Sequence, residues 1–201
     1  MMYQTIVIGI DQSYKRTGIS ISADGSLKIV RSKDLTKYRN NFERRRALRK
    51  TLNGLLTSVV GKAKEIKCVI ERIRLRSQGF LNIDYIKAIG ALNSVIVDVM
   101  SEYGIQVYSV DTRCWKAQVV STSKPVDNLY GVPPEKWPTV TWCVHKGFRE
   151  SILIDLSDTR RSKGTFSKNG RKYMYDNDAA DSAAISMFWF VGDLSKLEEE
   201  K

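Results

Sequence analysis

The chain has 201 residues and a mass of 22.9 kDa, enough for one domain with its own hydrophobic core. Apolar residues make up 42% of the sequence and charged residues 27%, which excludes wholesale disorder. Lys and Arg number 33 against 22 Asp and Glu, so the formal net charge is +11. A surplus of this size favours a polyanionic partner, although charge alone names no reaction.

The cysteines and the apolar runs indicate the compartment. Cys68, Cys114 and Cys143 lie far apart and form no CxxC pair, which favours a reducing environment and argues against a zinc cluster. No apolar run reaches the roughly 18 residues of a membrane helix. The first apolar stretch ends at Asp11 and follows no basic segment, so it is not typical of a signal peptide. We therefore expect a cytoplasmic protein with no membrane partner.

The first 120 residues alternate between strand-like and helix-like patterns. Hydrophobic periodicity predicts strands at 3–10, 18–23, 27–31, 67–71 and 105–110, and helices at 35–66, 79–102 and 111–120. Asp24-Gly25 joins the second and third strands as a hairpin, and Asp111 or Thr112 can cap the third helix. This order predicts an α/β fold with a five-stranded mixed sheet flanked by helices.

Residues 121–176 depart from this pattern because they hold all four prolines of the chain. One helix is predicted at 133–148. The segment 160–172 contains six Lys or Arg and no acid, which is typical of a flexible basic loop. An Ala-rich helix is predicted at 177–194, and the residues from 198 onward are expected to be a solvated end.

Four carboxylates stand where an unpaired charge is costly. Asp11 ends the first strand and Glu71 ends the fourth, while Asp178 and Asp181 share one face of the last helix. A carboxylate at the edge of a core needs a charged partner, hydrogen bonds or a metal ion. Four of them without four partners favour hard divalent cations, Mg²⁺ or Mn²⁺. Two such ions can hold a phosphodiester and activate a water molecule.

Each carboxylate also has a structural interpretation when it is taken alone. Asp11 could be a turn residue, and Glu71 could form a surface ion pair with Arg72. Asp178 could cap the last helix, and Asp181 could be an isolated polar residue. The metal interpretation depends on the four residues together.

Four segments carry a resemblance to a known family: IGIDQSYKRTGISI (8–21), VIERIRL (69–75), VDTRCWKAQVVS (110–121) and DNDAADSAAI (176–185). They resemble the RuvC family of Holliday junction resolvases, which belongs to the ribonuclease H-like and retroviral-integrase superfamily. The family motifs are an Asp followed six residues later by Thr-Gly, a Glu that closes the fourth strand, and Asp-Ala-Ala-Asp at the last helix. The matching residues are Asp11 with Thr17-Gly18, Glu71, and Asp178 to Asp181.

The resemblance implies one ribonuclease H-like nuclease domain over 1–201, with an insertion at about 121–175 before the last helix. It implies a homodimer that resolves four-way DNA junctions by paired nicks, leaving a 5′-phosphate and a 3′-hydroxyl. Two Mg²⁺ or Mn²⁺ ions would serve each active site. The catalytic residues and metal ligands would be Asp11, Glu71, Asp178 and Asp181.

Other positions are interpreted through the same resemblance. Lys116 stands where the family carries a basic residue near the active site, and is a candidate phosphate contact or transition-state stabiliser. Gln12-Ser13 replaces the family's Pro-Gly, and Arg74 replaces the aromatic wedge of bacterial members. The long insertion resembles phage and poxvirus members, which implies the host cytoplasm for a phage-encoded protein.

Basic residues gather in clusters that can follow phosphates without reading bases. The predicted DNA contacts are Arg72, Arg74, Arg76, Lys116, Arg160, Arg161, Lys163, Lys168, Arg171 and Lys172. A further basic run surrounds the start of the first helix: Lys37, Arg39, Arg44, Arg45, Arg46, Arg49 and Lys50. Such runs are also common on merely solvated faces.

Other functions stay open at this point. A general branched-DNA, flap or fork endonuclease of the same fold would use the same carboxylates. A non-catalytic DNA-binding module has no need to retain all four. An actin-like ATPase would need a second Gly-rich phosphate loop, which the sequence does not show.

Overall fold

The computed structural model describes residues 2–73, 83–120, 132, 134–156 and 165–200. The strands are β1 (Tyr3–Asp11), β2 (Arg16–Ala23), β3 (Ser26–Asp34), β4 (Ala63–Glu71), β5 (Gln106–Val110), β6 (Leu153–Asp155), β7 (Phe166–Lys168), β8 (Arg171–Tyr175) and β9 (Glu198–Glu200). The α-helices are α1 (Asn41–Val59), α2 (Ile83–Glu102), α3 (Thr112–Trp115), α4 (Trp137–His145) and α5 (Asn177–Val191). A π-helical turn at Lys116–Val120 continues α3, and short 3-10 turns lie at Pro134–Lys136, Glu150–Ile152 and Leu194–Lys196.

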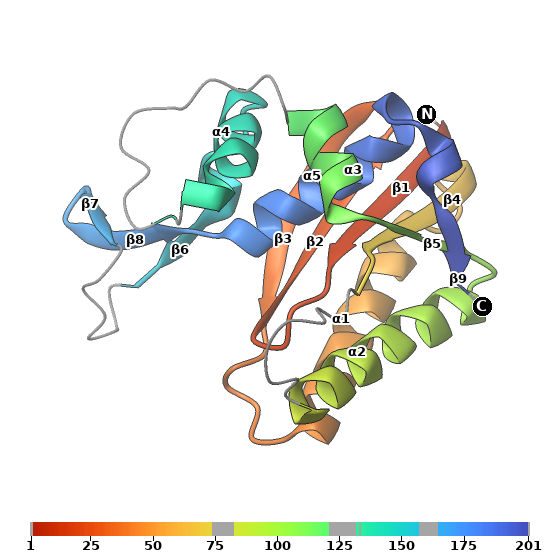
Figure 1. The fold of residues 1–201 in the computed structure, drawn as a ribbon, viewed down its shortest axis with the longest axis horizontal. Coiled ribbons are helices and arrows are strands. Elements are labelled where there is room, and N and C mark those ends of the chain that lie inside the picture. Colours follow the sequence, from red (N-terminus) through yellow and green to blue (C-terminus); the bar gives the residue numbers. More distant parts are fainter. Residues whose placement is uncertain (1, 74–82, 121–131, 133, 157–164, 201) are drawn as a thin grey trace.

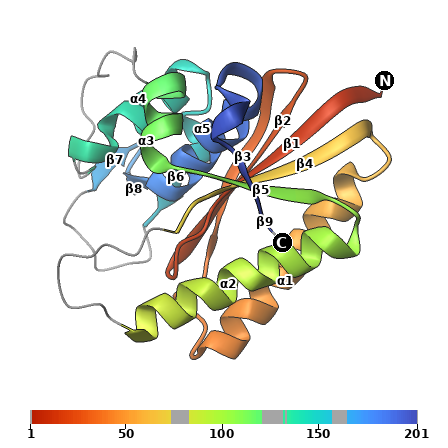
Figure 2. The ribbon, with the colours of Figure 1, turned by 45° about the vertical axis from the view of Figure 1, so that its right-hand side comes forward.

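A six-stranded mixed sheet in the order β3-β2-β1-β4-β5-β9 forms the centre of the fold. β1 pairs antiparallel with β2 and parallel with β4, so it lies in the interior of the sheet. Helices α1 and α2 lie side by side on one face of the sheet, and α5 crosses the other (Figures 1 and 2). A smaller sheet of β6, β8 and β7 lies beside α4.

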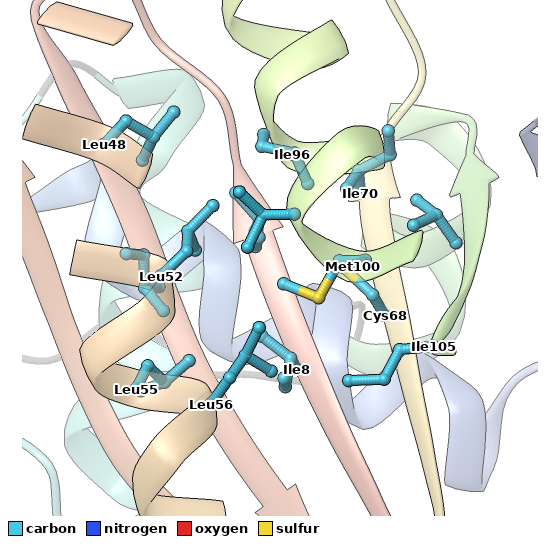
Figure 3. Packing of buried hydrophobic residues seen from close by; sticks show 14 of the residues in the cluster. Ile8, Leu48, Leu52, Leu55, Leu56, Cys68, Ile70, Ile96, Met100 and Ile105 are labelled. Atoms are coloured by element: carbon cyan, nitrogen blue, oxygen red, sulfur yellow. The ribbon is translucent and has the colours of Figure 1, made fainter. Parts of the chain in front are cut away.

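Two hydrophobic clusters fill the two faces of the central sheet. Ile8 and Ile70 point toward α1 and α2, where Leu52 and Ile96 cover them (Figure 3). Val7 belongs to the opposite cluster, which packs against α5. Because successive residues of a strand point to opposite faces, a strand buried on both sides is apolar throughout. This explains the unbroken apolar run that precedes Asp11.

The structure corrects several predicted element bounds. The helix predicted at 35–66 covers only Asn41–Val59, because the Asn40 side chain caps its start and Gly61 adopts a φ of +80° after its end. Residues 63–66 instead begin β4. The end predicted to be solvated contains β9, which pairs with β5 and makes the sheet six-stranded rather than five-stranded.

The predicted basic loop is in part a hairpin. Asn169 and Gly170 have φ values of +49° and +74°, as a two-residue turn between twisted strands requires, and they join β7 to β8. The helix predicted at 133–148 covers only Trp137–His145, since a 3-10 turn precedes it. In the described part of the chain, no helix is both long and apolar enough to cross a bilayer.

Candidate active site

Two of the predicted carboxylates lie at neighbouring strand ends on the α5 side of the sheet. Asp11 shares its face with Val7, and Glu71 shares its face with Val69, both of which belong to the α5 cluster. β1 and β4 run parallel with Ile10 beside Ile70, so the next residues in each strand are the two acids. The period of two along each strand thus brings Asp11 and Glu71 together.

Helix α5 brings the other two carboxylates to the same place. Asp178 lies in its first turn and Asp181 one turn further, and Asp181 is fully buried. The helix backbone is seated directly on the sheet, because a Cβ atom on Gly18 would lie 1.8 Å from the carbonyl oxygen of Asp178. Gly18 is also the register partner of Asp11. The glycine of the Thr-Gly pair after the first Asp therefore has a steric role in assembling the four acids.

Hydrogen bonds fix this helix along its length. Ser20 Oγ donates to the carbonyl oxygen of Ser182 at 2.6 Å, and the hydroxyls of Ser22 and Ser186 are 2.7 Å apart. At the start of the helix, the Asp176 side chain accepts a hydrogen bond from the backbone N–H of Ala179 at 3.1 Å. Asp176, rather than Asp178, is therefore the helix cap, which leaves the Asp178 carboxylate free of that structural role.

Burial and mutual repulsion disfavour negative charge in the cluster. The pKa of Asp11 is raised well above its usual value, first by burial and then by the charges of Asp181, Glu71 and Asp178. The pKa of Glu71 is raised by burial and by Asp181, although the hydroxyl of Thr112 donates a hydrogen bond that opposes the shift. The charges of these carboxylates thus act on one another, and Lys136 and Lys116 offset the repulsion only in part.

Lys136 is a site residue that the sequence did not reveal. Its ammonium pairs with Asp181 Oδ2, and only 29% of the lysine side chain is exposed. Burial alone would lower the pKa of Lys136, but Asp181, then Asp11 and Glu71, raise it above its usual value. The residue lies in the Pro-rich segment 121–176, just before α4, where no local pattern marks a lysine as functional. The acid cluster itself was the available signal, because it requires a cation.

Removing the Lys136 charge is expected to reduce stability. In Lys136→Gln, the buried Asp181 carboxylate loses its ionic partner, which we expect to cost about 2 kcal/mol of unfolding free energy. Chemical denaturation measures the loss, and adding Asp181→Asn to this variant should restore much of it. Lys146→Gln, at an exposed lysine after the same helix, is the control. Equal stability of the two single variants would contradict this role.

The acid cluster also predicts an unusual pH dependence. Burial, followed by the charge of Asp176, raises the pKa of Asp178 from 3.8 to about 7. The folded chain then holds a proton that the unfolded chain releases, so stability falls as the pH rises between about 4 and 7. In EDTA, the melting temperature should be lower at pH 7.5 than at pH 5, and Asp178→Asn should shrink the difference. A melting temperature that rises across this range would refute the expected sign.

The donor set fits a divalent cation in its chemistry. Asp181 Oδ1 is buried and has no hydrogen-bond partner within the described ranges. Together with the raised pKa values of Asp11 and Asp178, this orphaned oxygen shows a site short of positive charge. As placed, however, no three Asp, Glu, His or Cys side chains of the described residues form a ready metal-binding group. The lysine ammonium pairs with Asp181 instead.

The structure places the predicted basic residues in different surroundings. Lys116 is half-buried, with its ammonium 5.2 Å from the centre of the Trp115 ring, and its charge acts on Glu71. Arg72 forms an ion pair with Glu198 of β9 at 2.9 Å. Lys168 pairs with Glu150, Arg171 lies 3.6 Å from Asp155, and Lys172 is exposed on β8. Arg74, Arg76, Arg160, Arg161 and Lys163 lie outside the described residues. A role in DNA binding stays a prediction for all of them.

Comparison with solved structures identifies the fold. The chain superimposes on RuvC of Thermus thermophilus in complex with a Holliday junction substrate, with a TM-score of 0.59 and 12% identity over 98% of this chain and 100% of that one. A second structure of Thermus thermophilus RuvC gives 0.56 at 12% identity, covering 97% and 99% of the two chains. Ydc2, the yeast mitochondrial Holliday junction resolvase, gives 0.50 at 15% identity, covering 94% and 79%. In sequence, no family model and no curated protein matches the chain.

The class that emerges is a mixed α/β fold of the ribonuclease H type, which confirms the predicted fold class. Within that class, the chain has the fold of the RuvC-like resolvases, as the sequence motifs indicated.

Proposed function

We propose that the chain is a metal-dependent endonuclease that resolves four-way DNA junctions by paired nicks. The observation that carries this proposal is the meeting of carboxylates from β1, β4 and α5 on one face of a RuvC-like sheet. One of the solved structures with this fold holds a Holliday junction. The net charge of +11 also supports binding to a polyanion such as DNA.

The residues of the cluster have separate roles in this mechanism. Asp11, Glu71, Asp178 and Asp181 would hold the cations, two per active site, as Mg²⁺ or Mn²⁺. When bound, these ions lower the pKa of a water molecule and polarise the phosphodiester. Thr112 orients the Glu71 carboxylate through its hydrogen bond. Lys136 balances charge beside Asp181, and Lys116, whose charge acts on Glu71, would meet a phosphate there. The expected products carry a 5′-phosphate and a 3′-hydroxyl.

Paired nicks in opposite strands need two active sites related by symmetry, which is why the proposal includes a homodimer. The rival within the same fold is an endonuclease for flaps or replication forks, which needs only one site. The two differ in the cuts they make, because a resolvase makes symmetric nicks that a ligase can seal.

The deciding experiment compares three DNA substrates. The protein is incubated with a four-way junction, a replication fork and a linear duplex, each with Mg²⁺ and with EDTA. We expect symmetric, religatable nicks in the junction that depend on Mg²⁺. Preferred cutting of the fork would favour the rival, and cutting of the linear duplex at an equal rate would refute structure selectivity.

A further inference from the structure

Two tyrosines and an arginine meet where β1 ends. The guanidinium carbon of Arg44 in α1 lies 3.9 Å from the centre of the Tyr14 ring, in the connection between β1 and β2. The ring of Tyr85, in the first turn of α2, meets the Tyr14 ring edge-on at 6.4 Å. Figures 1 and 2 both show this connection beside the first turns of α1 and α2. These residues are called the Tyr14 cluster: Tyr14, Arg44 and Tyr85.

The connection that carries Tyr14 is tied down on both sides. Gln12 Nε2 donates a hydrogen bond to the backbone carbonyl oxygen of Glu71. Thr17 Oγ1 donates to the carbonyl oxygen of Ser13 at 3.3 Å, and the N–H of Leu35 donates to that of Lys15 at 2.8 Å. The Gln12-Ser13 departure from the family's Pro-Gly thus supplies a direct link to the second carboxylate strand. These bonds tie the backbone that carries Tyr14 to the strand that ends at Glu71.

The positive charge of the Tyr14 cluster is not neutralised within the described part of the chain. Arg44 forms no ion pair there, and its Nε and Nη1 atoms are buried with no hydrogen-bond acceptor. The neighbouring Arg45, Arg46 and Lys15 are exposed, and they too have no ion pair among the described residues. Stacking on the aromatic ring, rather than a carboxylate, positions the Arg44 guanidinium. The patch therefore keeps its attraction for phosphate.

Large apolar side chains are also exposed in the first turns of α1 and α2. Tyr85 is 54% exposed and Ile83 in the same turn is 62% exposed, while Phe42 at the start of α1 is 67% exposed. Aromatic rings within a basic patch are the chemistry that takes up unpaired nucleotides, since bases stack on the rings and phosphates meet the cations. A second copy of this chain is a poorer occupant, because a twofold interface would place the arginines of both copies near one another.

The distance to the acid cluster suits a nucleotide next to the cut. Tyr14 follows Asp11 by three residues, which span at most about 10 Å between Cα atoms. That is about three steps of a stacked DNA strand, at 3.4 Å per nucleotide. A strand whose phosphate lies at the carboxylates can therefore continue over the sheet end to the Tyr14 cluster.

We infer that the Tyr14 cluster is a stacking site for an unpaired nucleobase within about three nucleotides of the cut phosphate. This inference deepens the proposed function and rests on it for the position of the cut. Tyr85 offers the base an exposed ring, and the Tyr14 ring meets that ring edge-on. The positive charge of Arg44 and of the exposed Lys15, Arg45 and Arg46 attracts the adjoining phosphate. The site then selects DNA that exposes unstacked bases, as branch points do, over uninterrupted duplex.

The test measures binding without cleavage, in EDTA, on DNA with 2-aminopurine at each of the three positions beside a branch point. Tyr85→Ala should weaken binding to branched DNA about tenfold, leave duplex binding unchanged and abolish the fluorescence change of the stacked base. Tyr85→Phe should keep both properties, because stacking uses the ring and not the hydroxyl. Tyr103→Ala, at an exposed tyrosine beyond the far end of α2, is the control.

Each outcome separates the stacking site from the proposed function. If the wild-type chain does not cut junctions but Tyr85→Ala still loses affinity for unpaired DNA, the resolvase proposal fails and the stacking site stands. If the wild-type chain cuts junctions and Tyr85→Ala binds them equally well, the stacking site is wrong. It is also wrong if sedimentation shows that Tyr85→Ala converts a dimer to a monomer and weakens duplex and junction binding alike.

Discussion

In Asp11→Asn, the rate of junction nicking should fall by at least about 100- to 1,000-fold, while binding to the junction persists. The substitution removes one charged oxygen donor from the cluster and keeps the size of the side chain. Binding should even tighten slightly, because one negative charge near the DNA phosphates is lost. Single-turnover nicking in Mg²⁺ and a binding titration in EDTA measure the two effects separately.

The same variant should be more stable than the wild-type chain when no metal is present. Burial and three neighbouring carboxylates raise the pKa of Asp11, so its charge opposes folding near neutral pH. A neutral side chain removes this electrostatic repulsion and the cost of burying a charge. A gain in stability together with a loss of activity is typical of an acid that serves function rather than folding. Asp98→Asn is the matched control, since Asp98 is an exposed acid whose ion pair with Arg49 spans 3.8 Å. Wild-type cutting by Asp11→Asn would exclude the carboxylate site.

The features of this molecule that could be predicted are those that follow from the short sequence periods of strands and helices. A strand buried on both faces must be apolar, so Asp11 and Glu71 stand out as the residues that break two apolar runs. The spacing of Asp178 and Asp181 places them on one helix face. These patterns sufficed to indicate the four acids without any contact being known. The α/β class followed from the order of predicted strands and helices, and the ribonuclease H-like fold from the family resemblance.

What local patterns could not show are pairings between distant segments. Glu198–Glu200 has poor intrinsic strand propensity, and β9 forms only because the edge of β5 offers it backbone partners. Lys136 reaches Asp181 across 45 residues of sequence from the Pro-rich segment. The Asn169-Gly170 turn was a readable hairpin signal, but the lysines and arginines around it favoured the loop interpretation. A contact between distant segments thus brings the Lys136 ammonium to the acid cluster.

Gly18 links a local sequence motif to a contact between distant segments. Its missing side chain lets the backbone of α5 approach β2. A methyl group in Gly18→Ala would lie 1.8 Å from the carbonyl oxygen of Asp178 and 2.3 Å from its carbonyl carbon, which are backbone atoms that cannot rotate away. Helix α5 must shift, and overpacking of this kind costs about 1–3 kcal/mol of unfolding free energy. A displacement of about 1 Å at Asp178 should lower the nicking rate about 100-fold.

The matched control is Gly54→Ala in α1, where a methyl group would meet no atom within 4 Å. This exposed helical position should gain about 0.5–1 kcal/mol, because Ala favours the helix over Gly. The same substitution thus carries opposite signs at two glycines, which denaturation curves resolve. Nicking is compared well below the melting temperature, so that a displaced site is distinguished from an unfolded chain. If Gly18→Ala kept wild-type stability and rate, α5 could not be seated on β2 as the structure places it, and the four carboxylates would need another means of assembly.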